Sequence, residues 1–387
     1  MKESLNLDYI PKGYSSLAIN CGIKDKSLDL GIIHSEKPAN AAAFFTTNKI
    51  KGAPVLVGKK HINDGLIQTL IVNSKVSNVA MGKKGYEDAL YVCKKTAENL
   101  NIKTDLIFPS STGVIGRPLP VDKIVNAITN LKTKLIHPPD FKTFAEAIMT
   151  TDTFPKYVSK KIGSSSLIAV AKGAGMIEPN MATMLTYFFT DAEIEAEALR
   201  KIFHKAVDNS FNCLSVDSDT STSDTALILA NGLAGRVDLS LFEEKVFEAA
   251  IELTKMLAFD AEGATKLFIV DIEGAKDNEQ AKKIGKSIIN SPLVKTAIYQ
   301  GDPNWGRIYM AIGKTPDVEI DEEKIELFWG KTPKKYSNDE LKSLSEYIKS
   351  SREIYLKINL NIKDGISRVY GCDLTEEYVR INAFYTT

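Results

Sequence analysis

The amino-acid sequence predicts an α/β protein. Helix and strand signals alternate along its 387 residues, which is typical of sheets covered by helices. Apolar side chains recur at steps of three and four between Tyr86 and Asn101 and between Leu241 and Leu257, indicating two amphipathic helices. Ile354–Ile362 alternates apolar and polar residues over most of its length, as a half-buried strand does. A chain of this length can bury a large core and form two or three subdomains.

The central stretch Lys172–Thr186 reads KGAGMIEPNMATMLT and lies between two apolar runs of strand length. These runs, Ser166–Ala171 and Met184–Thr190, predict two short strands joined by an irregular connection. Two glycines permit backbone angles that other residues resist, and a proline removes one donor and fixes one angle. The connection is therefore expected to hold a defined shape and to deliver Ala182-Thr183 to the start of the second strand.

A threonine at that place has two interpretations. A hydroxyl needs a base to attack a carbonyl, and one solution is the threonine's own amino group, which exists only after the preceding peptide bond is cut. The small Ala182 leaves its carbonyl accessible to the hydroxyl of Thr183, so attack there would convert the amide into an ester that water hydrolyses. The alternative is a structural threonine at a strand start, which is the commoner case for such a local pattern.

The first third of the chain is expected to contain short elements. Residues 14–60 predict short strands and turns, and Gln68–Val72 and Asp105–Phe108 each predict a strand. The sequence PSSTGVIGRPLP (Pro109–Pro120) follows the second of these strands. Backbone N–H groups in such a segment lack ladder partners and can point at an anion or a developing oxyanion. An ordinary strand-to-helix turn is the alternative.

The remaining elements are predicted from a helix N-cap, an apolar helix face and turn-forming residues. Lys161–Ser165 is a plausible hairpin turn, and Asp191 is a plausible N-cap. The helix that Asp191 would cap has an apolar stripe of Leu199, Ile202, Phe203 and Ala206. A polar run leads into a strand within Ser215–Ala230, and Phe259–Val270 places an acid and a glycine before another strand. Ser291–Ile308 suggests a rigid turn, and Gly365 turns the chain from Ile354–Ile362 into a further strand.

No metal or disulfide framework is expected. The four cysteines lie far apart, which favours free thiols in a reducing compartment. The four histidines are isolated, so zinc is not expected. The acidic run that contains Asp217, Asp219 and Asp224 lacks the spacing and the terminal glutamate of a calcium loop.

Composition excludes several functional classes. Lys plus Arg equals Asp plus Glu at 49 each, so the charge balance gives no support to nucleic-acid or acidic-membrane binding. The N-terminal residues have no apolar segment of signal-peptide length, and no apolar run is long enough to span a bilayer. A cytoplasmic location is expected.

A family resemblance sharpens these expectations. KGAGMIEPNMATML is similar to KG-S/A-GMI-x-PNMATML, the signature of the ornithine acetyltransferase (glutamate N-acetyltransferase) family of arginine biosynthesis. Further similar segments are Ala41–Val55, Ser111–Gly116, the TTDT run at 150–153, Ser215–Asp224, Ser291–Ile308 and Tyr378–Thr387. The resemblance implies the ArgJ/DmpA-like, self-processed Ntn-type α/β fold, with mixed sheets packed by helices.

The resemblance also implies a self-made nucleophile. The chain would cut itself between Ala182 and Thr183 into an α fragment, residues 1–182, and a β fragment, residues 183–387. Thr183 would then attack the acetyl group with its own α-amine as the base, and its acetyl ester would make the kinetics ping-pong. Thr112 and Gly113 would form the oxyanion hole.

Substrates and substrate contacts follow from the same resemblance. The acetyl donor would be N2-acetylornithine and the acceptor glutamate, with no cofactor, and acetyl-CoA is a possible second donor. Contacts would come from Thr183 itself and from Thr150, Lys172, Glu262, Asn382 and Thr387. The two fragments would assemble as a heterotetramer, α2β2, or a larger complex.

This sequence departs mildly from the family's SVDGDTSTND at Ser218 and Ser223, and it departs from the family pattern at two further places. The family usually has NSGNANACTG where this chain has NSKVSNVAMG (Asn73–Gly82), with changes that include Lys75, Val76, Ser77 and Met81. Many relatives carry histidine where this chain has Glu178, whose carboxylate could affect processing or substrate charge recognition, or could simply face solvent. A self-processing Ntn-type aminopeptidase and an inactive relative are therefore the alternative interpretations.

Overall fold

The computed structural model describes residues 7–178 and 184–384. The chain forms two compact units, which are described separately. The first contains the described part of residues 1–173, 179–208 and 220–253, and the second contains residues 174–178 and 209–219 and the described part of residues 254–387. Each unit combines a β-sheet with packed helices, so the predicted α/β class is confirmed. Among the described helices, none has both the length and the apolar character needed to cross a bilayer.

The first unit is built on an eight-stranded sheet of mixed direction. The strand order is β4-β3-β2-β8-β7-β6-β5, with β1 paired to β2 beside this path. Its strands are β1 (Tyr14–Ile19), β2 (Leu30–Phe45), β3 (Leu66–Asn73), β4 (Ile107–Ser111), β5 (Lys156–Ile162), β6 (Ser165–Lys172), β7 (Leu185–Glu193) and β8 (Thr225–Arg236). The pairs β3–β4 and β7–β8 are parallel and the other pairs are antiparallel.

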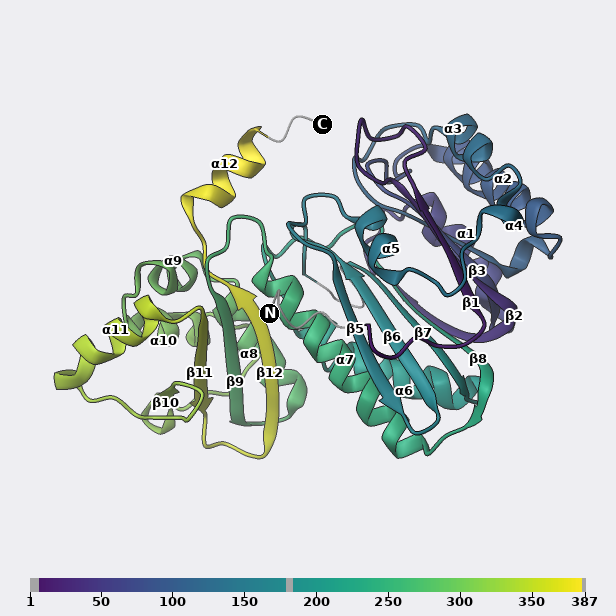
Figure 1. Ribbon diagram of the computed structural model, residues 1–387. Helices are drawn as coiled ribbons and strands as arrows, with labels where there is room; N and C mark the ends of the chain where they lie inside the picture. Colours follow the sequence, from purple (N-terminus) through teal and green to yellow (C-terminus); the bar gives the residue numbers. More distant parts are fainter. Residues whose placement is uncertain (1–6, 179–183, 385–387) are drawn as a thin grey trace. The chain divides into compact units, whose positions relative to one another are not determined.

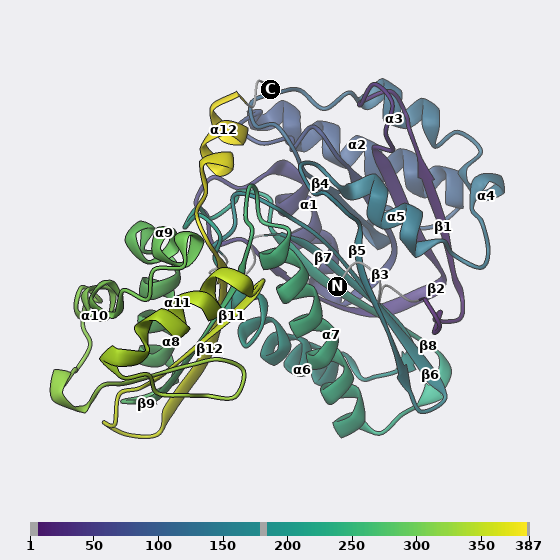
Figure 2. The ribbon, with the colours of Figure 1, turned by 60° about the vertical axis from the view of Figure 1, so that its left-hand side comes forward.

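Helices cover this sheet (Figures 1 and 2). They are α1 (Ala53–His61), α2 (Gly82–Leu100), α3 (Val121–Ala127), α4 (Leu131–Lys134), α5 (Phe141–Ile148), α6 (Ala196–Asp208) and α7 (Leu239–Phe259), of which residues up to Leu253 belong to this unit. Its described residues also form 3-10 turns at Ile62–Asp64 and Thr104–Leu106. Helices α1 and α2 pack against β4, whereas α6 packs against β2.

The core of the first unit brings together strands that are distant in the sequence. Tyr187 on β7 and Phe108 on β4 share one buried cluster, which also includes Phe141 and Phe144 of α5. Within it the Tyr187 hydroxyl donates a 2.7 Å hydrogen bond to the hydroxyl oxygen of Ser110. Because burial leaves these hydroxyls without water, the bond fixes the start of β7 beside the end of β4.

The second unit has a four-stranded sheet of order β10-β11-β9-β12. Its strands are β9 (Leu267–Ala275), β10 (Glu326–Trp329), β11 (Glu353–Asn359) and β12 (Gly365–Cys372). Its helices are α8 (Asn278–Ile289), α9 (Pro292–Gln300), α10 (Trp305–Gly313), α11 (Leu341–Ser350) and α12 (Glu376–Phe384), with 3-10 turns at Phe211–Cys213, Glu322–Lys324 and Asn338–Glu340. Helix α8 packs across β9 and β12 (Figure 1).

Periodicity predicted the long helices and the central strands correctly. The helix expected at Tyr86–Asn101 is α2, which begins four residues earlier, and the helix expected at Leu241–Leu257 lies within α7. The strands beside the central stretch are β6 and β7, which pair antiparallel. The apolar stripe that contains Leu199 and Phe203 is buried on α6.

Three expectations about where strands, helices and turns lie are wrong. Residues 14–60 are not only short strands and turns, because β2 is a 16-residue strand and the helix α1 follows it. The strand expected at Asp105–Phe108 begins at Ile107 after a 3-10 turn and continues through Pro109 to Ser111. β4 is an edge strand, where a proline's missing donor leaves no ladder gap. Ser291–Ile308 is largely helical, with α9 and α10 separated by a short turn.

Asp191 is not the N-cap that the sequence indicated. It lies within β7, and α6 begins only at Ala196. Its buried carboxylate accepts hydrogen bonds from the backbone N–H groups of Ser166, at 2.7 Å, and Lys12, at 2.9 Å. The aspartate therefore ties three segments that are distant in the sequence, a role that a local pattern does not reveal.

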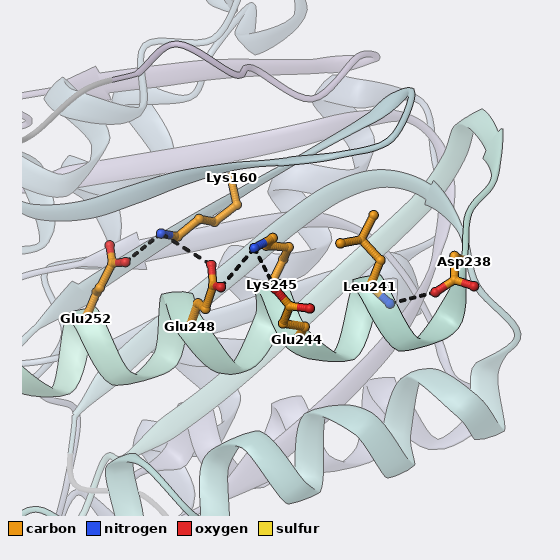
Figure 3. A network of polar contacts seen from close by, with 7 residues as sticks. All are labelled: Lys160, Asp238, Leu241, Glu244, Lys245, Glu248 and Glu252. Atoms are coloured by element: carbon orange, nitrogen blue, oxygen red, sulfur yellow. Dashed lines mark hydrogen bonds and ion pairs between the residues drawn. The ribbon is translucent and has the colours of Figure 1, made fainter.

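A network of ion pairs on the surface connects α7 with β5 (Figure 3). Lys160 of β5 contacts the carboxylates of Glu252, at 2.5 Å, and Glu248, at 3.7 Å. Lys245 contacts Glu248 and Glu244, each at 2.8 Å. Both glutamates that hold Lys160 are more than a third exposed, so solvent screens these pairs.

We expect Lys160→Met to change the free energy of unfolding by less than about 1 kcal/mol, because exposed ion pairs contribute little. Urea unfolding of the wild type and the variant at low and high salt measures this change. A loss above about 2 kcal/mol would show that the network stabilises the fold far more than its exposure suggests.

Candidate active site

The loop after β4 carries Thr112 and Gly113 and packs directly against another backbone. Gly113 has φ +125°, and a Cβ there would lie 2.2 Å from the carbonyl carbon of Lys75. The Val114 N–H donates to the Lys75 carbonyl at 2.9 Å, in a short parallel bridge between the loops that follow β3 and β4. Only glycine fits this position, because both the angle and the space exclude a side chain.

One detail of the oxyanion expectation needs correction. The Thr112 N–H is not free, because it donates a 3.0 Å hydrogen bond to the carbonyl of Asn73. Within the described residues, neither the Gly113 N–H nor the Thr112 hydroxyl has a hydrogen-bond partner. The Gly113 N–H and the Thr112 side chain are therefore donors that this loop can offer to an oxyanion.

The loop that departs from the family pattern has an unusual backbone. Lys75, Asn78 and Ala80 have φ of 78°, 53° and 60°, a region that non-glycine residues rarely adopt. Asn73 holds its first turn, since its amide donates to the Val76 carbonyl at 2.8 Å and accepts from the Ser111 hydroxyl at 2.5 Å. The bulkier sequence thus keeps a tight turn beside Gly113.

A buried carboxylate organises the TTDT segment and the start of the central stretch. Asp152 accepts from the Thr150 N–H at 3.0 Å and from the Gly173 N–H at 2.7 Å. It also pairs at 2.7 Å with the ammonium group of Lys156, and both side chains are fully buried. Thr150 and Lys172, two expected substrate contacts, are thereby held by one group in the first unit.

The electrostatics of Asp152 follow from its partners. Burial by itself would raise the pKa of Asp152, but the ammonium groups of Lys156 and Lys172 and the hydrogen bonds to it hold that pKa well below its usual range. Sequence reasoning placed only Thr150 in this segment. The signal for Asp152 was a lysine four residues later, which fits an ion pair but is too common a pattern to identify one.

We expect Asp152→Asn to lower the free energy of unfolding at pH 7 by about 3–5 kcal/mol, because it removes the buried carboxylate that pairs with the ammonium group of Lys156. Since the folded pKa is lowered, the contribution of Asp152 is present above the unfolded pKa of about 3.9 and is lost as pH falls toward the folded value. Urea unfolding at pH 7 and at pH 3 compares the wild type with this variant and with Asp25→Asn, an exposed control. Equal stability of the three proteins at pH 7 would contradict the assignment.

Asp224 is a second buried acid that the sequence did not single out for the site. It directly precedes β8. The N–H group of Thr225, the first residue of β8, donates a 2.9 Å hydrogen bond to the Met184 carbonyl. The Asp224 Oδ2 atom has no hydrogen-bond partner in the described parts of the chain. Burial raises the pKa of Asp224 well above its usual range, against the lowering effects of Ser221, Lys172 and Thr46. Of the three aspartates examined for calcium, only this one belongs to the first unit.

The second unit brings Glu262 and Asn382 together. The Asn382 amide on α12 donates to Glu262 Oε2 at 3.0 Å. The Glu262 N–H donates to the Ala174 carbonyl at 2.9 Å, and a Cβ on Gly175 would lie 2.5 Å from the same carboxylate oxygen. A glycine of the central stretch therefore makes room for Glu262.

Residues 176–178 of the central stretch are also held by hydrogen bonds within the second unit. Asp217 accepts from the N–H groups of Met176, at 2.7 Å, and Ile177, at 2.8 Å. The Glu178 carboxylate accepts from Asn290 at 2.6 Å and Ser215 at 3.0 Å. The interpretation in which Glu178 simply faces solvent is thus wrong.

The expected site residues are distributed over both units. Thr112, Gly113, Thr150 and Lys172 belong to the first unit, and Glu262 and Asn382 to the second. Ala182, Thr183 and Thr387 lie outside the described residues. Within the part of the chain that the structure describes, no group of three or more His, Cys, Asp or Glu side chains is placed to hold a metal ion.

Comparisons with known proteins cover nearly the whole chain. The ArgJ family model matches residues 15–387. The chain is 47% identical to arginine biosynthesis bifunctional protein ArgJ 2 of Clostridium acetobutylicum, with 97% of this chain and 98% of that protein covered. It is 41% identical to glutamate N-acetyltransferase Oat2 of Streptomyces clavuligerus, with 97% and 98% covered. A crystal structure of argJ from Bacillus halodurans shares 36% identity, covers 50% of this chain and 96% of its own, and has a TM-score of 0.48. The chain therefore belongs to the ArgJ family.

Proposed function

We propose that the chain is a glutamate N-acetyltransferase of arginine biosynthesis that moves an acetyl group from N2-acetylornithine to glutamate. The observation that carries this proposal is the family match over residues 15–387. Two relatives that share at least 41% identity bear the names arginine biosynthesis bifunctional protein and glutamate N-acetyltransferase. The geometry at Gly113, a glycine-only turn with an unpaired N–H among the described residues, supports acyl-transfer chemistry.

The first step of the proposal is self-cleavage. The Thr183 hydroxyl attacks the carbonyl of Ala182, and the peptide bond becomes an ester with the threonine's amine set free. Water then hydrolyses the ester and leaves an α fragment, residues 1–182, and a β fragment, residues 183–387. The product is an N-terminal threonine that carries both the nucleophile and its base.

Acetyl transfer then proceeds in two half-reactions. The α-amine of Thr183, with an unperturbed pKa of about 8, accepts the hydroxyl proton as the oxygen attacks the acetyl carbonyl. The Gly113 N–H and the Thr112 hydroxyl donate to the oxyanion, and the proton passes to the departing amine of ornithine. The amine of glutamate next attacks the acetyl ester and releases Thr183. One nucleophile shared by two half-reactions gives ping-pong kinetics.

Substrate binding is assigned by charge type. Lys172 would pair with a substrate carboxylate, and Thr150 would contact the substrate, with both backbones fixed by Asp152. Glu262, whose carboxylate accepts a hydrogen bond from the Asn382 amide N–H, would receive an ammonium group, because a carboxylate suits a cation, and Asn382 would contact the substrate beside it. Thr387 would complete the contacts. The fragments would assemble as α2β2, and acetyl-CoA is the second donor to assay.

We expect the purified wild-type protein to contain two fragments, the second of which begins at Thr183. Intact mass and N-terminal sequencing of the wild type and of Thr183→Ala measure this, and the variant stays a single chain because it lacks the hydroxyl. A single uncut chain in the wild type would rule out the self-made nucleophile. Acetyl transfer from N2-acetylornithine, and separately from acetyl-CoA, to glutamate is the matching activity assay.

We expect Thr112→Val to lower kcat for acetyl transfer by about 10²–10³-fold, the usual effect of removing one oxyanion donor. The variant keeps the side-chain shape, so circular dichroism should show an intact fold. Thr112→Ser retains the hydroxyl and serves as the matched control, with a much smaller loss. Full activity of Thr112→Val would exclude the hydroxyl from the oxyanion hole.

A further inference from the structure

Lys75 occupies a position that disfavours a side chain. It adopts φ +78° and lies in van der Waals contact with Gly113, as the 2.2 Å approach of a hypothetical Cβ to its carbonyl carbon shows. In this region a residue other than glycine is strained, by about 1 kcal/mol. The family pattern, NSGNANACTG, has glycine here. A lysine in its place puts a charged residue, at the expense of backbone strain, on the backbone that contacts Gly113.

The surroundings of Lys75 are fixed by hydrogen bonds within the first unit. The neighbouring Ser74 donates from its N–H to the Asp29 carbonyl at 2.9 Å and from its hydroxyl to the Ala147 carbonyl at 2.7 Å. The ammonium group of Lys24 donates to the Met149 carbonyl at 2.7 Å, one residue before Thr150. These hydrogen bonds connect the segment around Lys24 with the loop of Lys75 and with the residues just before the TTDT segment.

Lys172 joins the same group through Asp152, which binds the N–H groups of both Thr150 and Gly173. Lys24, Lys75 and Lys172 are all half-buried, and the charges of Lys75 and Lys172 act on Lys24. The ammonium group of Lys75 has neither a hydrogen bond nor an ion pair with any described residue.

The lysines of this region act on one another's charge. The pKa of Lys24 is lowered to about 8, chiefly by burial and also by the positive charges of Lys172 and Lys75, against the raising effects of Asp29 and Asp152. The carboxylate of Asp29 is already engaged by the N–H groups of Cys21, Ile23 and Lys24, and that of Asp152 by Lys156. A ligand that brings negative charge would relieve the repulsion among these lysines.

We propose that Lys75, together with Lys24 and Lys172, binds the second carboxylate of a dicarboxylic amino acid and is a specificity-determining residue of this chain. The inference rests on the proposed function, since it assigns a preference between that reaction's two amino acids. Glutamate carries two carboxylates, whereas the side chain of ornithine ends in an ammonium group that Lys75 repels. Lys75 thus favours the half-reaction in which glutamate accepts the acetyl group.

The first experiment compares steady-state kinetics of Lys75→Gln, Lys75→Arg and Lys75→Gly with the wild type. In a ping-pong reaction the kcat/KM value for each substrate depends only on the half-reaction in which that substrate takes part. Lys75→Gln should lower kcat/KM for glutamate about tenfold, the effect of one charge-assisted hydrogen bond, and leave that for N2-acetylornithine within about twofold. Lys75→Arg should keep the preference. Lys75→Gly relieves the strained φ, so its loss of preference cannot be attributed to misfolding.

Lys132→Gln, which removes an exposed charge on α4, is the matched control and should change neither value. Equal losses for both substrates in Lys75→Gln would show a merely structural role and overturn the proposal. Unchanged values for both would overturn it as well.

A binding measurement separates this inference from the proposed function. Calorimetric titration of wild type and Lys75→Gln with L-glutamate and with L-ornithine requires no turnover. Glutamate should bind about tenfold more weakly to the variant, and ornithine should bind no more weakly. If the wild type shows this dependence but transfers no acetyl group, the proposed function fails and the carboxylate site stands. If the wild type does not bind glutamate, or binds it independently of Lys75, the site is refuted.

Discussion

The carboxylate of Asp152 is the group on which the first unit's expected substrate contacts depend. A charge in a fully buried position must be paired and hydrogen-bonded, because its desolvation costs several kcal/mol, roughly. Here the partners are an ammonium group at the head of β5, the backbone before it and the N–H of Gly173. These partners come from segments that follow α5 and β6, so meeting the electrostatic need of one side chain also sets the position of Thr150 and Lys172.

Two further contacts hold the loop that carries Thr112 and Gly113. Tyr187 and Ser110 join the start of β7 to the end of β4 through their hydroxyls, and Gly113 packs against Lys75 with no space for a methyl group. Both contacts lie in the first unit and neither is close in sequence. The loop of Thr112 and Gly113 is therefore held by packing and by hydrogen bonds, which is the preorganisation that oxyanion stabilisation requires.

Sequence patterns predicted the elements whose signals are local. The helical stripes of α2, α6 and α7 and the paired strands β6 and β7 follow from the spacing of apolar residues. The family signature indicated candidate residues that spacing cannot supply. Periodicity failed at β2, because a strand that pairs on both sides and shifts register lacks a simple alternation. It failed at Asp191 because that aspartate serves distant backbone groups instead of a helix start.

The parts of the site that sequence reasoning missed are long-range or conformational. Asp152 and Asp224 look like turn aspartates in the sequence, and only their burial distinguishes them. The pairing of the Thr112 N–H with Asn73 depends on a parallel bridge between two loops. The positive φ of Lys75 is invisible in the sequence, although its replacement of a family glycine was the available hint.

Glu178 also departs from the family pattern, but a nearby lysine compensates the charge that it introduces. Its carboxylate lies 3.7 Å from the ammonium group of Lys286 and accepts hydrogen bonds from Asn290 and Ser215. Burial lowers the pKa of Lys286, and Glu178 acts to raise it again, as a compensating charge should. The glutamate therefore adds little net charge where the central stretch leaves the second unit. Lys75 differs, since its charge has no compensating acid among the described residues, and of the two departures it is the one that can alter recognition of a charged substrate.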